Sequence, residues 1–202
     1  MFHGFRRTLP ALTAALVVGL FGAGSFAVAG NHGPDHNGGH DHHGWWGHGH
    51  KGCHGKRVSG LDERWLMSHI ETNLFEIAGG KAALDRRDTS DEVRELAEML
   101  VADHTSALAQ ATALAERLGV PVAAAPSPLQ QWALRAVATF SGDDFDRWFV
   151  DLQVEGHRQA IAETQLEVAR GCNRKVRYTA AAALPVLERH LAHAEAILEP
   201  AH

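Results

Sequence analysis

Three histidines and one glutamate fall near the middles of four long segments with helical periodicity. Glu76, His104, His157 and His190 each lie about fourteen to sixteen residues after the predicted start of their helix, so they fall at one level whichever way each helix runs. Each also lies on or at the edge of an apolar stripe. Three imidazoles and a carboxylate suit Zn, Ni, Cu, Co or Fe. The sequence therefore predicts a divalent transition-metal site in the middle of a helical bundle.

Three further residues belong to this candidate site. His193 lies one turn beyond His190, and His69 lies two turns before Glu76 on the same side of its helix. Asp103 is a candidate orienter of an imidazole, because ligating histidines commonly donate their second N–H to a carboxylate. The alternative interpretation is a buried polar network that fixes helix register and holds no metal.

A second group of histidines lies among glycines near the N-terminus. Eight of the 15 histidines belong to it: His32, His36, His40, His42, His43, His48, His50 and His54. Residues 30–60 contain too few apolar side chains to offset the entropy of ordering, so we expect a disordered tail. Such a tail is a metal-binding segment of low specificity, and protonation below about pH 6 would release its metal.

The first 29 residues resemble a secretory signal peptide. Arg6 and Arg7 precede an apolar run that ends in Ala27-Val28-Ala29, with cleavage expected after Ala29. We therefore expect an exported protein of the periplasm or cell envelope, with no membrane span after cleavage. The chain carries 19 basic and 24 acidic residues, a formal charge of −5 that argues against a nucleic-acid partner. The sequence does not identify a protein partner.

Helical patterning begins at Leu61 and predicts an all-α domain over residues 61–199. We expect helices over 61–85, 89–118, 129–140, 144–170 and 174–198. Thr89 with Glu92 fits a capping box at the start of the second helix, and Pro185 should kink the last one. The four long helices predict a four-helix bundle. The connection over residues 119–143 is long enough for a crossover that carries a short helix, as in ferritin-like folds; an up-down-up-down bundle with a decorated loop is the alternative.

The two cysteines discriminate between these topologies. With a crossover, Cys172 lies at the end of the bundle where the first helix starts, within easy reach of Cys53. Without it, the chain between Cys53 and the first helix would have to be almost fully extended to reach. A disulfide is therefore a hypothesis tied to the crossover, and export favours it.

Two stretches, together with Glu76, carry a resemblance to a known family. They are Met99-Leu100-Val101-Ala102-Asp103-His104-Thr105, and the series Ser141-Gly142, Phe145-Asp146, His157, Leu184-Pro185 and His190. In these the chain resembles an exported bacterial family catalogued as domain of unknown function 4142, over roughly residues 61–198. The resemblance implies a ferritin-like bundle with the crossover and brings no activity. One departure is Gly156-His157, where the family tends to have Asp-His.

Three functions remain open at this point. The first is an exported metal-binding protein, with the tail and the bundle as its two sites. The second is a structural or envelope-stress interaction bundle whose core histidines are only hydrogen-bonded. The third, an oxidase-like metalloenzyme, is disfavoured because di-iron bundles use Glu-x-x-His, which this sequence lacks. We therefore expect a binding protein rather than an enzyme.

Overall fold

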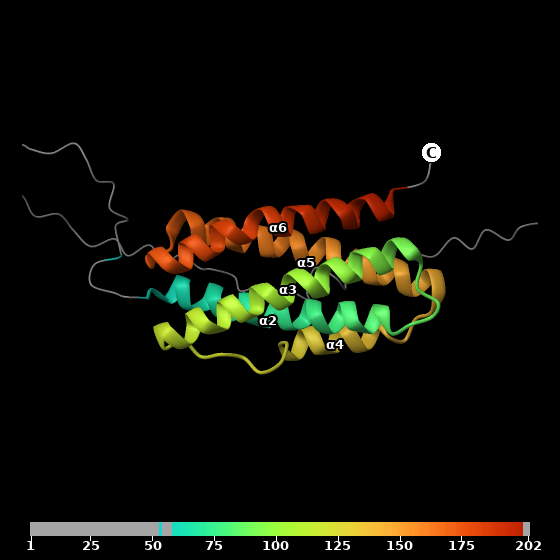
Figure 1. The fold of residues 1–202 in the computed structure, drawn as a ribbon, viewed down its shortest axis with the longest axis horizontal. Helices are drawn as coiled ribbons and strands as arrows, with labels where there is room; N and C mark the ends of the chain where they lie inside the picture. Colours follow the sequence, from blue (N-terminus) through green and yellow to red (C-terminus); the bar gives the residue numbers. More distant parts are fainter. Residues whose placement is uncertain (1–52, 54–57, 200–202) are drawn as a thin grey trace, which may run out of the picture.

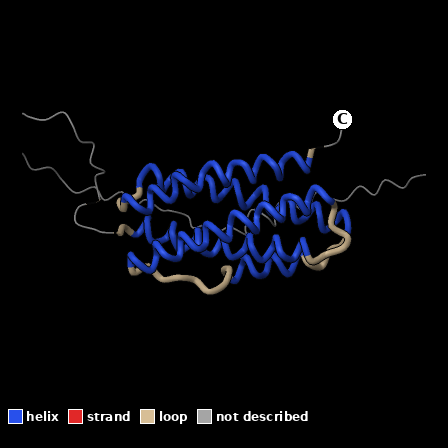
Figure 2. The backbone as a smooth tube through the Cα atoms, in the orientation of Figure 1, coloured by secondary structure: helices blue, strands red, loops and turns tan. Residues whose placement is uncertain are grey.

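The computed structural model describes Cys53 and residues 58–199, which form five helices and no strand (Figures 1 and 2). They are α2 (Gly60–Leu84), α3 (Asp91–Leu118), α4 (Pro128–Val137), α5 (Gly142–Arg170) and α6 (Arg174–Leu198). The predicted all-α class is confirmed, and each predicted helix is present. The expected signal peptide and nearly all of the expected tail lie outside the described residues.

The helix ends follow local capping chemistry. The Ser59 side chain accepts a hydrogen bond from the Asp62 backbone, and Asp62 returns one, which completes a capping box at α2. The predicted box of Thr89 with Glu92 is wrong by one residue: Ser90 caps α3, while the Thr89 hydroxyl donates to the Ala83 carbonyl at 3.0 Å. Ser and Thr are both good caps, so sequence alone does not separate neighbours. Pro185 lies in the interior of α6, and the helix continues through it without interruption.

Two of the long helices run one way and two the other. One core cluster joins Ala83, at the end of α2, to Val93, near the start of α3, and to Phe145, near the start of α5. The same cluster contains Ala194, near the end of α6. Thus α3 and α5 are parallel, and the chain between them returns along the bundle, as Figure 1 shows. The predicted crossover is present; a relationship to ferritins stays a prediction.

The crossover covers one face of the bundle only. Its helix α4 packs against α2 and α5, where Ala133 meets Phe75 and Leu152 in a small core cluster. The opposite face lies between α3 and α6. The two long faces of the bundle therefore differ: α4 covers the first, and no described element covers the second.

Apart from this small cluster at α4, the apolar core is divided into two. One cluster contains the end of α2 and the start of α3, and the other contains Trp65, Leu114 and Val176 at the opposite end. Between them lies a layer of polar side chains that are at most 3% exposed: Asn73, Glu76, His104, Gln153, His157 and His190. Buried polar groups cost free energy unless they are paired, so this layer needs a specific explanation.

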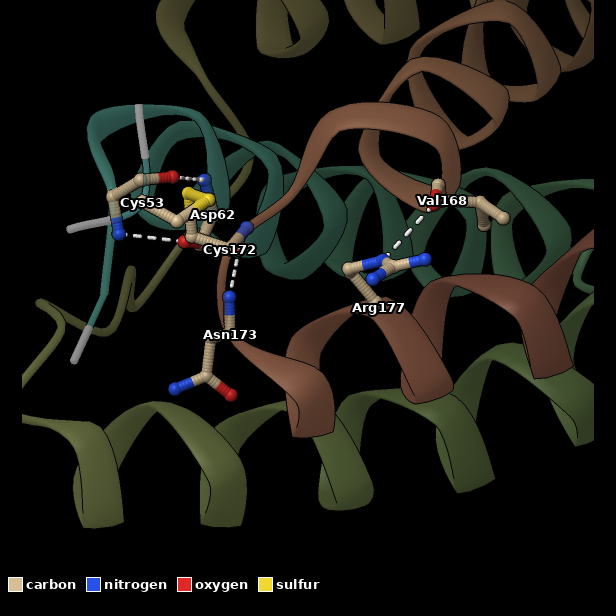
Figure 3. The surroundings of a disulfide bond; sticks show 7 residues. Cys53, Asp62, Val168, Cys172, Asn173 and Arg177 are labelled. Carbon is tan, nitrogen blue, oxygen red and sulfur yellow. Dashed lines mark hydrogen bonds between the residues drawn. A yellow bond between two sulfur atoms is a disulfide. The ribbon is translucent and has the colours of Figure 1, made fainter. Parts of the chain in front are cut away.

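A disulfide joins Cys53 to Cys172, with the Cα atoms 5.3 Å apart. Figure 3 shows Asp62 beside it: one carboxylate oxygen accepts hydrogen bonds from the backbone N–H groups of Cys172 and Asn173, each at 2.9 Å. The turn between α5 and α6 is therefore fixed to the start of α2. None of the described helices has a stretch long and apolar enough to cross a membrane.

Candidate metal centre

His104, His157 and His190 converge from α3, α5 and α6 in the middle of the polar layer. Each contributes one ring nitrogen to a group whose members all lie within 4.8 Å of one another. All three side chains are buried. Each of the three sits near the midpoint of a helix of 25 to 29 residues.

The hydrogen bonds of His157 determine which nitrogen is free. Its Nδ1 lies 2.8 Å from the backbone carbonyl of Gln153, an acceptor only, so Nδ1 carries the proton. Its Nε2 therefore presents a lone pair toward the other histidines.

A side-chain amide fixes His104 in the same way. Asn73 donates from Nδ2 to the His69 carbonyl at 2.6 Å, which leaves Asn73 Oδ1 as the acceptor for His104 Nδ1–H at 2.8 Å. The remaining nitrogen, His104 Nε2, is buried and has no hydrogen-bond partner among the described residues.

His190 uses the opposite tautomer. Its Nε2–H donates to Asp103 Oδ2 at 2.9 Å, and Arg189 donates to the same oxygen at 2.6 Å. Asp103 thus accepts a hydrogen bond from the His190 ring. The unprotonated nitrogen of His190 is Nδ1, which lies 3.3 Å from His157 Nε2.

The three rings are neutral near pH 7. Burial lowers the pKa of His157 to about 4 and that of His104 well below its usual range. Burial also lowers the pKa of His190, although the hydrogen bond to Asp103 opposes the shift. Because both rings are neutral and each carries its single N–H on the outer nitrogen, the lone pairs of His157 Nε2 and His190 Nδ1 face each other across 3.3 Å. A cation shared by the two nitrogens would satisfy both lone pairs.

Glu76 lies in the same layer but outside this close group. It is 1% exposed, and its Oε2 has no partner among the described residues. Burial raises the pKa of the Glu76 carboxyl to about 8, while the nearby Gln153 amide acts in the opposite direction. Neither polar atom of that amide makes a hydrogen bond of good geometry to another described residue. The unsatisfied polar atoms of the layer thus belong to Glu76, Gln153 and His104 among the described residues.

The other two predicted histidines also lie outside the group. His69 stacks on Trp65, with ring centroids 4.7 Å apart, and burial lowers its pKa to about 4. It lines a cavity of about 200 Å³ together with Asn73 and His104. His193 is half-buried one turn beyond His190.

Sequence reasoning missed Asn73, Gln153 and Arg189. Asn73 lies four residues after His69, and Gln153 lies four residues before His157. Four residues are about one helical turn, so each shares a helix face with its histidine. A polar residue on an apolar stripe next to a histidine was the available signal. Arg189 gave none, because it is an exposed arginine on a charged face.

Comparison with known proteins supports the fold. A family model described as "Domain of unknown function (DUF4142)" matches residues 51–197. The crystal structure of a DUF305 fragment from Deinococcus radiodurans is similar with a TM-score of 0.62 and 17% identity, covering 70% of this chain and 97% of that one. At that identity the similarity concerns the fold alone. No curated protein matches the sequence.

Proposed function

This chain belongs to the DUF4142 family, and we propose that its bundle binds one transition-metal ion between His104, His157 and His190. The observation that carries the proposal is the 3.3 Å approach of two unprotonated nitrogens, His157 Nε2 and His190 Nδ1. The third unprotonated nitrogen, on His104, is buried in the same group and has no partner in the described chain.

The distance between His157 Nε2 and His190 Nδ1 fits a tetrahedral ion. Zinc–nitrogen bonds of about 2.0–2.1 Å in a tetrahedron place two ligand nitrogens about 3.3–3.4 Å apart. Neutral imidazoles without thiolate suit Zn, Cu, Ni, Co or Fe(II). Each ring also has the outer hydrogen bond that holds a ligating histidine: to Gln153, to Asn73 and to Asp103. A fourth ligand would come from Glu76, once deprotonated, or from water.

In this proposal the histidine-rich tail captures metal ions. In an exported protein the tail would bind ions weakly and raise their concentration near the bundle, and the buried group would hold one ion in a defined geometry. Export and the tail's role rest on the sequence patterns at residues 1–29 and 30–54.

Metal titration of two full-length variants separates the two sites. In a full-length protein whose tail histidines are changed to Asn, calorimetry with Zn²⁺ or Co²⁺ should show one ion per chain. Adding His157→Asn should weaken that binding by at least about 100-fold. The matched control is His193→Asn, a half-buried histidine on α6, which should leave binding unchanged. One ion bound with equal affinity in both variants would overturn the assignment.

The alternative is a structural bundle in which the histidines only form a polar network. The outer hydrogen bonds of all three rings are compatible with it. In that case His157→Asn changes the melting temperature by the same amount with and without metal. Stabilisation of the wild type by metal that the variant lacks would exclude the alternative, because an ion that binds only the folded protein stabilises it.

A further inference from the structure

The uncovered face between α3 and α6 contains a continuous groove that leads to the candidate metal centre. Its inner part is the cavity of about 200 Å³ that reaches Asn73 and His104. Its outer part has a volume of about 690 Å³, and Gln110, Tyr178 and Thr179 line both parts. Tyr178 is 77% exposed. An exposed aromatic ring in an open groove is a ready contact for another segment.

The outer end of this groove is cationic. Arg117 contributes from the last turn of α3, and Arg174 and Lys175 contribute from the first turn of α6. The inner end instead presents Asp103 and the polar side chains of the buried layer.

The disulfide places Cys53, near the C-terminal end of the histidine-rich tail, at that outer end. Cys172 comes two residues before Arg174, and Asp62 holds the backbone of Cys172 and Asn173 in place. Because Cys53 is bonded to Cys172, Cys53 itself is held next to the mouth of the groove.

We propose that residues 30–52 of this chain dock in the groove between α3 and α6 and pass metal ions from the tail to the buried histidines. This inference rests on the proposed function for its second half, the transfer of ions. The docking itself stands on the tether and the groove alone.

The length of the segment matches the groove. From Arg174 to Leu187 the groove follows α6 for about 20 Å, at 1.5 Å per residue. An extended chain covers that distance in about six or seven residues. His48 and His50 can therefore lie along the outer groove, and His42 and His43 can reach its inner end. A tether this short gives the segment an effective concentration at the groove in the millimolar range.

A second copy of the chain and a small organic anion are the other possible occupants, and the experiment below distinguishes them.

Photo-crosslinking in the metal-free, full-length, oxidised protein tests the docking. With benzoylphenylalanine in place of Tyr178, mass spectrometry should find crosslinks within one chain to peptides from residues 30–52. The control position is Leu129, 40% exposed on the opposite face beside α2 and α5, and it should give at least about fivefold fewer such crosslinks. Equal yields at both positions, crosslinks between two chains, or no crosslink to the tail would overturn the proposal.

Transfer is tested separately by the rate at which Co²⁺ added to the full chain develops the absorption of a tetrahedral site. Ala182→Trp should fill the groove and slow this rate at least tenfold, with the final absorption unchanged. An unchanged rate would overturn transfer along the groove. If no tetrahedral cobalt forms in the wild type, the metal site itself fails, and the crosslinks still decide the docking.

Discussion

The carboxyl group of Glu167 on α5 lies beside that of Asp62 on α2, and both side chains are completely buried. Burial and the hydrogen bond and charge of Asp62 raise the pKa of Glu167 to about 8. Burial of Asp62 acts in the same direction, but hydrogen bonds from Ser59 and Asn173 outweigh it and lower the pKa of Asp62. The pair therefore carries one proton at neutral pH, held by Glu167.

The first prediction is a loss of stability with rising pH that depends on Glu167. Its pKa is about 8 in the folded protein and 4.5 ordinarily, so the unfolded chain releases the proton first as pH rises. The contribution is full below about pH 4.5 and is lost progressively up to about pH 8. Glu167→Gln should remove this loss. Urea denaturation of metal-free protein between pH 5 and 9 measures it, with the exposed Glu188→Gln as control. A constant difference in unfolding free energy between wild type and E167Q across that range would refute it.

The second prediction concerns Gly171, which closes α5. A Cβ at this position would overlap the Glu167 carboxylate and the backbone oxygen of the same residue. Gly171→Ala should therefore lower the free energy of unfolding by about 1–3 kcal/mol. Combining it with Glu167→Ala should restore part of the loss. Gly60→Ala is the control, because there the nearest atom is the flexible end of Arg64. Equal effects of the two single substitutions would contradict the packing argument.

The third prediction tests the position of Asp103. Asp103→Ala removes the acceptor of His190 Nε2–H and frees the ring to adopt the other tautomer. Zn²⁺ affinity at the bundle site should fall about 10–100-fold, with one ion still bound. Calorimetry on the protein with Asn in place of the tail histidines measures this. Asp144→Asn, exposed at the start of α5, serves as control; an affinity loss no greater than the control's would show that Asp103 does not orient a ligand.

The fourth prediction separates stability from metal binding. His157→Leu removes one of two facing lone pairs from the core and replaces it with an apolar side chain. Without metal, the melting temperature should stay the same or rise, because a buried unsatisfied polar atom is lost. With Zn²⁺ the wild type should gain several degrees and the variant none. Calorimetric melting of both proteins with and without metal gives the answer. A variant that melts lower without metal would show that the histidines stabilise the fold by themselves.

Much of this fold could be predicted because periodicity and helix stops are local signals. The Gly119 stop is an example: this residue has φ 71° and ends α3, as glycine does in the left-handed region. The crossover followed from the length of one connection, and the cysteine pairing followed from the crossover. The capping residue of α3 was missed by one position because Thr89 and Ser90 have similar capping chemistry.

The candidate site was predicted from two quantities: the position of each residue along its helix and the helix face on which it lies. Those two quantities bring the three histidines together because their helices are similar in length. They do not fix how far a side chain reaches, so Glu76 lies in the same layer but outside the close group. The tautomers depend on acceptors from other helices or the backbone, such as Asn73 and the Gln153 carbonyl. The Asp62–Glu167 pair could not be predicted from the sequence either, because acidic residues near helix ends are usually exposed.

The disulfide has one more consequence. It closes a covalent ring from Cys53 to Cys172 that contains α2, α3, α4 and α5, and it leaves α6 outside. Two of the clustered histidines belong to the ring, and His190 belongs to the free arm. An ion bound by all three would act as a second cross-link, one that protons or chelators can undo.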